Sequence, residues 1–149
     1  MNLLVSLNRW KRMLKLPFKP IAQVAELHGK VVLVRVSINV PIEDGVVQNQ
    51  FRVTRGLASI NYLINQGAKV VLVGHIGRSG EESTKLIADL FNQYVPTSHA
   101  PEITGSESAN LIEQLPPGEV LLLENVRRDP REKENDDEFA RALADLADV

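Results

Sequence analysis

Stretches typical of buried strands alternate with stretches typical of helices from residue 30 onward. Val31–Val36 (VVLVRV) is a valine-rich run with a single charge, as expected for a strand that is covered on both faces. Pro41–Gly45 has the composition of a turn. Residues 52–65 then place apolar side chains at helical spacing, and Gly67 is suited to end that helix. The pattern predicts a strand, a turn and a helix in succession.

The same alternation continues to the end of the chain. Further strands are predicted at Lys69–Val73, Val95–His99 and Val120–Glu124, and further helices at residues 83–94, 106–115 and 137–146. Ser83 and Thr84 are suited to cap the first of these helices, and Ser106 the second. Residues 126–136 form the only candidate linker. Because strands and helices alternate over short connections, the sequence predicts a three-layer, Rossmann-like α/β domain with a mainly parallel sheet.

Length and composition limit the class of protein further. The 149 residues are enough for one compact domain but not for two ordinary ones. With 44% hydrophobic and 24% charged residues the chain has the composition of a globular protein. It contains no cysteine, which excludes disulfides, thiolate metal sites and a thiol nucleophile. The net charge is −2 although residues 1–20 are basic, so the remainder is acidic, which argues against a nucleic-acid partner.

The N-terminal segment is treated as a basic extension over residues 1–25, ahead of a domain over residues 26–149. Charges interrupt its apolar stretch, which excludes a signal peptide. Four apolar residues share one face of a helix that would suit a membrane surface, namely Leu3, Leu7, Trp10 and Leu14. The favoured interpretation is a short helix packed on its own domain or a frayed extension, so no membrane partner is expected.

Candidate functional residues follow directly after the predicted strands, where open parallel sheets bind their ligands. Arg52 begins the first predicted helix near the same rim. Arginine side chains and helix N-termini suit phosphate and carboxylate oxygens, so this rim predicts a small, strongly anionic ligand. Each residue taken singly is more often a solvated charge or a structural loop residue. The residues that follow the strands are Ser37, Ile38, Asn39, His75, Ile76, Gly77, Arg78, Asn125, Val126, Arg127 and Arg128.

Other common site motifs are not present. No Gly-x-Gly-x-x-Gly follows a predicted strand, so the dinucleotide-binding fingerprint is missing. Residues 77–85 (GRSGEESTK) lack the Gly-Lys-Ser/Thr order of a phosphate-binding loop. The three histidines, His28, His75 and His99, show no metal-ligand spacing.

Several segments resemble the N-terminal, substrate-binding domain of phosphoglycerate kinase. They are Gly29–Pro41 (GKVVLVRVSINVP), Gly74–Ser79 (GHIGRS), Leu121–Arg127 (LLLENVR) and Asn135–Val149 (NDDEFARALADLADV). The resemblance runs from about Glu26 to the end, in the family's order and spacing. It is specific because several separate motifs match in register.

The resemblance implies an activity as well as a fold. In this family the N-terminal domain holds 3-phosphoglycerate or 1,3-bisphosphoglycerate, and a C-terminal domain holds ADP or ATP with Mg²⁺. A hinge joins the two, and phosphoryl transfer between acyl phosphate and ADP follows domain closure. The implied protein is a cytoplasmic enzyme of glycolysis. Because this chain contains no nucleotide domain, it is expected to bind neither nucleotide nor metal by itself.

The resemblance also assigns roles to rim residues. Arg52 corresponds to the catalytic arginine that faces the transferring phosphoryl group. The other substrate contacts implied by the motifs are Asn39, His75, Arg78, Arg127 and the backbone of Ile76 and Gly77. Two substrate positions depart from the family, with Ser37 in place of an aspartate that accepts a hydrogen bond from a substrate hydroxyl and Ile38 in place of a phenylalanine.

Two alternatives remain open at this point. Ser37 and the missing nucleotide half favour a degenerate domain that binds an anion, or nothing, without catalysis. A second alternative is an interaction role in which the basic N-terminus docks a partner chain or membrane. The sequence also ends at Val149, where the family continues into a further strand, so we expect this chain alone to transfer no phosphoryl group.

Overall fold

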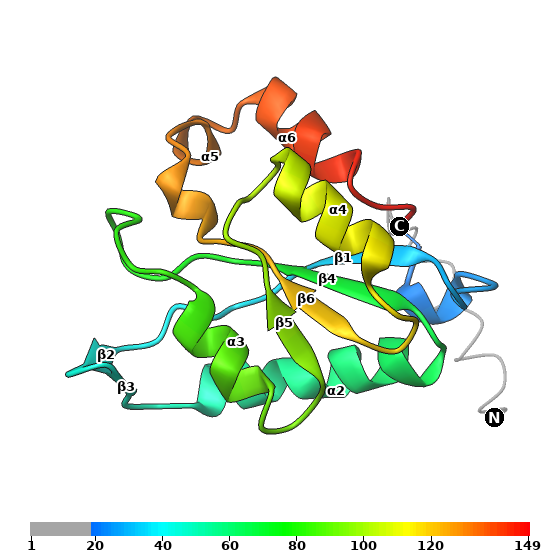
Figure 1. Cartoon of the computed structure of the whole chain (residues 1–149), viewed down its shortest axis with the longest axis horizontal. Coiled ribbons are helices and arrows are strands. Elements are labelled where there is room, and N and C mark those ends of the chain that lie inside the picture. Colours follow the sequence, from blue (N-terminus) through cyan, green and yellow to red (C-terminus); the bar gives the residue numbers. More distant parts are fainter. Residues whose placement is uncertain (1–18) are drawn as a thin grey trace, which may run out of the picture.

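Four parallel strands form the centre of the computed structural model, which describes residues 19–149 (Figure 1). They lie in the order β1-β4-β6-β5. All three pairings between neighbours are parallel, which confirms the predicted sheet. The expectation for the N-terminal extension concerns mainly residues 1–18, which lie outside the described range. The strands are β1 (Val31–Arg35), β4 (Lys69–Val73), β5 (Thr97–His99) and β6 (Val120–Leu122).

Helices cover both faces of the sheet, as the predicted three-layer architecture requires. In Figure 1, α2 and α3 lie below the sheet, and α4 and α6 lie above it. The α-helices are α2 (Phe51–Asn65), α3 (Lys85–Phe91), α4 (Ser106–Gln114), α5 (Arg131–Glu134) and α6 (Asp137–Ala144). The short elements are η1 (Ile21–Gln23), β2 (Ile42–Glu43), β3 (Val46–Val47) and η2 (Val126–Arg128).

Alternating side chains of β4 supply the two hydrophobic layers of the core. Val70 and Leu72 are buried in the layer that includes Ile60 of α2. Val71 and Val73 are buried in the opposite layer, which includes Ile112 of α4. Successive strand residues point to opposite faces, so a strand covered on both sides must be apolar throughout. This explains the continuous apolar run of the sequence at β4.

A tight hairpin replaces the simple turn predicted at Pro41–Gly45. β2 and β3 pair in antiparallel fashion, with Ile42 opposite Val47. Asp44 and Gly45 between them have φ values of 51° and 74°. Two consecutive left-handed residues are typical of the hairpin turns favoured by Asp-Gly. The hairpin follows Asn39 and borders the candidate site.

Some predicted boundaries are wrong in detail. Gly105, not Ser106, holds the cap position of α4, and Ser106 is the first helical residue. Thr84 precedes α3, but its hydroxyl donates to Leu123 O at 2.8 Å and makes no capping bond. Residues 126–136 are not a linker, because they form η2 and α5 and the side chain of Val126 is buried.

The last two residues lie along the outer edge of β1. Leu33 N donates to Val149 O at 2.8 Å, and the backbone N–H groups of Asp148 and Val149 donate to Val31 O. Val31 N in turn donates to a carboxylate oxygen of Asp148 at 2.8 Å. The chain therefore pairs with β1 as it reaches Val149. Within residues 19–149 no helix combines the length and the apolar character needed to cross a bilayer.

Candidate functional site

A cleft of about 670 Å³ lies beyond the carboxyl ends of β1 and β4. We call it the first cleft, and it gathers five of the nine predicted site residues. Its lining also includes residues of the hairpin and the carboxylate of Glu82, which opposes anion binding. The five predicted residues are Asn39, Arg52, Ile76, Gly77 and Arg78.

A second cleft of about 420 Å³ adjoins the first and shares Phe51 and Arg52 with it. It contains Ser37, which is exposed, together with Arg35 and Arg55. Three arginines line this hollow, and arginine favours an anion because its guanidinium group donates planar pairs of hydrogen bonds. Ser37 thus lies among arginines, where the family resemblance places an aspartate.

Arg52 sits at the boundary of the two clefts because it lies in the first turn of α2. The start of this helix is fixed by Asn49, whose side-chain oxygen accepts from Phe51 N at 2.9 Å. Arg52 Nη1 donates to Asn39 O at 3.0 Å, which joins α2 to the segment that follows β1. The remaining N–H groups of this exposed guanidinium have no hydrogen-bond partner among the described residues. They are free to bind a ligand in either cleft.

Asn39 also holds the loop that follows β4. Its side-chain oxygen accepts from Gly77 N at 3.1 Å, so the backbone of Gly77 is turned toward the end of β1. Gly77 has a φ of 67°, and a Cβ there would collide with the Glu82 carboxylate. This contact brings together two predicted site residues that lie 38 positions apart in the sequence.

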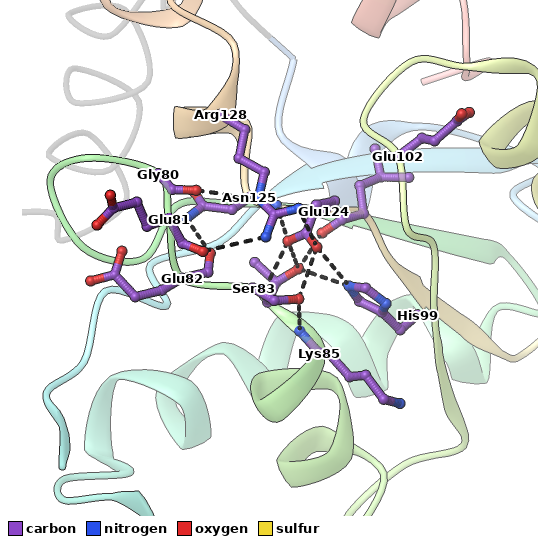
Figure 2. Close-up of polar contacts among 12 residues, drawn as sticks. Gly80, Glu81, Glu82, Ser83, Lys85, His99, Glu102, Glu124, Asn125 and Arg128 are labelled. Carbon is purple, nitrogen blue, oxygen red and sulfur yellow. Dashed lines mark hydrogen bonds and ion pairs between the residues drawn. The ribbon is translucent and has the colours of Figure 1, made fainter. Parts of the chain in front are cut away.

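Asn125 and Arg128 fix the remainder of this loop from the β6 side (Figure 2). The buried Asn125 amide donates to Ile76 O and to Glu82 O, both at 2.8 Å. Arg128 donates from Nε to Gly80 O at 3.2 Å and from Nη2 to Glu81 O at 3.3 Å. The loop that carries Arg78 is therefore held at both ends.

Glu124 is the buried carboxylate at the centre of the contacts in Figure 2. It accepts from Thr84 N at 2.9 Å, from Asn125 N and from Ser83 Oγ at 2.8 Å, and it pairs with Arg128 at 3.3 Å. Burial acts to raise the pKa of Glu124, but these hydrogen bonds and Arg128 outweigh it and hold the pKa below its ordinary value. Burial lowers the pKa of neighbouring His99 despite the attraction of Glu124. Glu124 is thus a charged group that ties the loop to α3 and η2.

His75 and Arg127 line neither cleft, although both were predicted site residues. They lie with Arg35 and Glu132 in a group of charges on the same rim. Glu132 pairs with Arg35 Nη2 at 2.9 Å and with Arg127 Nε at 3.1 Å. Burial lowers the pKa of His75, as do the charges of Arg127 and Arg35, while Glu132 opposes them. These influences together favour the neutral form of His75.

Ile38 is the predicted site residue that the fold removes from the clefts. Its side chain is 1% exposed in the hydrophobic core and packs close to Gly74. The prediction that the Ile38 side chain contacts the substrate is therefore wrong. This side chain points inward because its direction alternates with those of Ser37 and Asn39. The family resemblance gave no role to Glu124, Asn125 or Arg128, although Asn125 and Arg128 were among the candidates that follow the strands. Their place directly after an apolar strand was the available signal, but their partners lie in distant segments.

Comparisons with known proteins agree on one family. The family model of phosphoglycerate kinase matches residues 21–149. The phosphoglycerate kinase of Fervidobacterium nodosum is 40% identical over 133 residues, covering 83% of this chain and 33% of the relative. That of Syntrophobacter fumaroxidans is 41% identical over 132 residues, with the same two coverages.

Solved structures give the same result. The phosphoglycerate kinase structure from Coxiella burnetii matches with a TM-score of 0.73 and 31% identity, over 89% of this chain and 33% of that one. The structure from Pyrococcus horikoshii OT3 matches with a TM-score of 0.69 and 31% identity, over 83% and 33%. The chain thus spans about a third of the length of the relatives it matches.

Proposed function

The chain belongs to the phosphoglycerate kinase family, and from this premise we propose that the two adjoining clefts bind 3-phosphoglycerate or 1,3-bisphosphoglycerate. The ligand is a small, strongly anionic acid, and the rim offers it several guanidinium groups. The whole protein then transfers a phosphoryl group between the acyl phosphate and ADP, as a cytoplasmic step of glycolysis. This chain supplies the half that holds the acid.

The position of Arg52 carries the proposal. Its guanidinium lies at the junction of both clefts, and it is anchored through a single hydrogen bond to Asn39 O. A ligand bound at the junction lies between Arg78 of the first cleft and Ser37 of the second, with its carboxyl end at Arg52. A carboxyl or acyl phosphate group then meets Arg52, which is the role that the family resemblance gives it.

Phosphoryl transfer depends on positioning of the reacting groups and on charge stabilisation more than on a strong base. A carboxylate oxygen of the acid bonds to the terminal phosphorus of ATP while the bond from that phosphorus to ADP breaks. The reverse step returns the phosphoryl group to ADP. Arg52 stabilises the negative charge on the moving group, and Asn39 and Arg78 hold the acid in the first cleft. Arg127 and His75 line neither cleft and act on the phosphate of the acid from the same rim, beside Arg35 of the second cleft.

Magnesium and nucleotide belong to another part of the protein in this proposal. Among residues 19–149 no group of three His, Asp or Glu side chains lies close enough to hold a metal ion. Two acidic residues near the rim are instead engaged with arginines, Glu124 with Arg128 and Glu132 with Arg35. No step is assigned to magnesium on this chain, and Mg²⁺ with ATP or ADP is assigned to a second, nucleotide-binding domain.

Ser37 favours one second candidate, a domain that binds the acid without supporting catalysis. Serine is shorter than aspartate and uncharged, so it orients a substrate hydroxyl less firmly. The two candidates differ in turnover by the whole protein, not in binding by this chain.

NMR titration of the 149-residue chain with 3-phosphoglycerate tests the binding site. The largest shifts are expected at Asn39, Arg52, Gly77 and Arg78. Arg52→Ala and Arg127→Ala should each weaken binding by about 1.5–3 kcal/mol, the usual contribution of a charged hydrogen bond. Arg141→Ala, an exposed arginine on α6, is the matched control and should leave the affinity unchanged. Largest shifts outside the two clefts would contradict the assignment.

A coupled assay with 3-phosphoglycerate and magnesium-ATP tests whether this chain transfers a phosphoryl group without a nucleotide-binding domain. The purified 149-residue chain is expected to show no turnover, because no nucleotide group is brought in line with the acid. Turnover that copurifies with the chain and disappears in Arg52→Ala would show that the nucleotide binds here after all.

A further inference from the structure

Glu132 lies between two arginines that come from different parts of the rim. One carboxylate oxygen is 2.9 Å from Arg35 Nη2, just where β1 ends, and the other is 3.1 Å from Arg127 Nε on η2. The Glu132 side chain is 11% exposed, whereas that of Arg35 is 57% exposed. One carboxylate therefore pairs with two guanidinium groups, and the three side chains together have a net charge of +1.

The two contacts of Glu132 are unequal. The contact with Arg35 is a hydrogen bond. The Nε–H of Arg127 is buried and makes no hydrogen bond within residues 19–149, so its contact with Glu132 is a charge attraction without an aligned bond. Hydrogen bonds to charged groups weaken steeply when donor and acceptor are misaligned. Arg127 is thus the partner that Glu132 holds less well.

Glu132 is kept at this place by its own short helix. Asp129 accepts from Arg131 N and from Arg131 Nε, both at 3.0 Å, which fixes the first turn of α5. Asn135 ends the helix with a φ of 53°. The carboxylate is therefore presented to Arg127 by the fold itself.

We propose that Glu132 is an internal counterion that occupies Arg127 until a phosphate dianion displaces it, and so weakens anion binding at this arginine. This rests on the proposed function, because it takes Arg127 as an arginine that meets the substrate phosphate. A dianion offers more charge and more freely oriented acceptor oxygens than one carboxylate. When it takes Arg127, Glu132 stays paired with Arg35, so the displaced carboxylate is never left buried without a partner.

His75 provides a reporter that needs no ligand. Burial is the main cause that lowers the pKa of His75. The charges of Arg127 and Arg35 lower it as well, and the charge of Glu132 raises it. Removing the charge of Glu132 should therefore lower the pKa of His75 further. Phosphate bound at Arg127 should raise it again.

The test compares Glu132→Gln with the wild-type chain in NMR titrations with inorganic phosphate. Glutamine keeps the shape of the side chain and removes the competing charge, so phosphate should bind about three- to tenfold more tightly. This gain corresponds to about 0.7–1.4 kcal/mol of binding free energy. Formate, a monoanion, should gain less, because the repulsion exerted by Glu132 scales with the charge of the ligand. Glu134→Gln removes the same charge from an exposed position of the same helix and should change affinity less than twofold.

Two further measurements make the outcome decisive. In an Arg127→Ala background, Glu132→Gln should give no gain, and in the ligand-free chain it should lower the His75 pKa. Equal or weaker phosphate binding in Glu132→Gln overturns the proposal, as does a gain that persists without Arg127. If phosphate behaves as expected but wild type does not bind 3-phosphoglycerate, the proposed function fails while the counterion role of Glu132 stands.

Discussion

Asn125 and Ile76 exchange two hydrogen bonds, although 49 positions separate them in the sequence. The Asn125 amide donates to Ile76 O at 2.8 Å, and Ile76 N donates to Asn125 Oδ1 at 3.3 Å. Asn125 is fully buried, and its amide also donates a hydrogen bond to Glu82 O. One side chain thereby attaches the end of β6 to the loop of the first cleft.

Asn125→Ala should destabilise the domain by removing this attachment. The buried N–H and C=O groups of Ile76 would lose their partner, and the part-buried Glu82 O would lose its bond. Each buried group without a partner costs about 1–3 kcal/mol, so a loss of about 2–4 kcal/mol is expected. Urea unfolding measures the change in the free energy of unfolding. Asn110→Ala, at an exposed position of α4, is the control and should change it by less than about 0.5 kcal/mol. Similar values for both variants would show that the Asn125 bonds contribute little.

Gly80→Ala should be costly because the loop passes close to η2. Gly80 has a φ of 92°, and a Cβ there would lie 2.5 Å from Arg127 O, a backbone atom that cannot turn aside. Gly45→Ala is the matched control, since its φ is 74° but nothing lies within 4 Å of the added Cβ. The left-handed conformation alone costs about 1–2 kcal/mol, so Gly80→Ala should exceed Gly45→Ala by more than the error of urea unfolding. Equal losses would mean that the loop moves without cost.

Ser37→Asp should tighten binding of 3-phosphoglycerate. The new carboxylate restores an acceptor for a substrate hydroxyl, and the arginines of the second cleft offset its repulsion of the ligand. Calorimetry measures the affinity, and Ser59→Asp supplies the same charge from another position of that cleft. Unchanged or weaker binding in Ser37→Asp would indicate that the new carboxylate pairs with the arginines instead of orienting the ligand.

Glu124 should make the stability of the domain depend on pH in the acid range. Its pKa in the folded chain lies below the ordinary value of 4.5. The unfolded chain therefore takes up its proton first, so the stabilisation by Glu124 is fully present above pH 4.5 and is lost as pH falls through the folded pKa. Urea unfolding at pH values from about 7 down to about 3 follows this loss.

Glu124→Gln should be less stable than wild type at neutral pH and should show a shallower decline on acidification. Glu113→Gln, at an exposed position of α4, should keep the wild-type profile. A profile for Glu124→Gln that runs parallel to wild type across the acid range would show that another carboxyl group is responsible.

The class of fold was predictable from the sequence because it depends on local periodicity. Lys69–Val73 is apolar after its first residue, which is what a strand between two layers of helices requires, and the structure has β4 at the same bounds. The 15 residues of α2 likewise carry their buried side chains at helical spacing. The rule that ligands bind past the strand ends then placed Asn39, Arg52 and Gly77 at one rim, where they line one cleft.

The pairing of side chains across the rim was decided only by the tertiary structure. Arg35 and Glu132 are 97 positions apart and meet because β1 is an edge strand and α5 folds over its end. Residues 126–136 have the composition of a linker, yet they pack as η2 and α5 because Val126 enters the core. A pattern of apolar residues fixes the type of element and its buried face. Which charged groups meet depends on strand order and loop path, and neither leaves a local trace in the sequence.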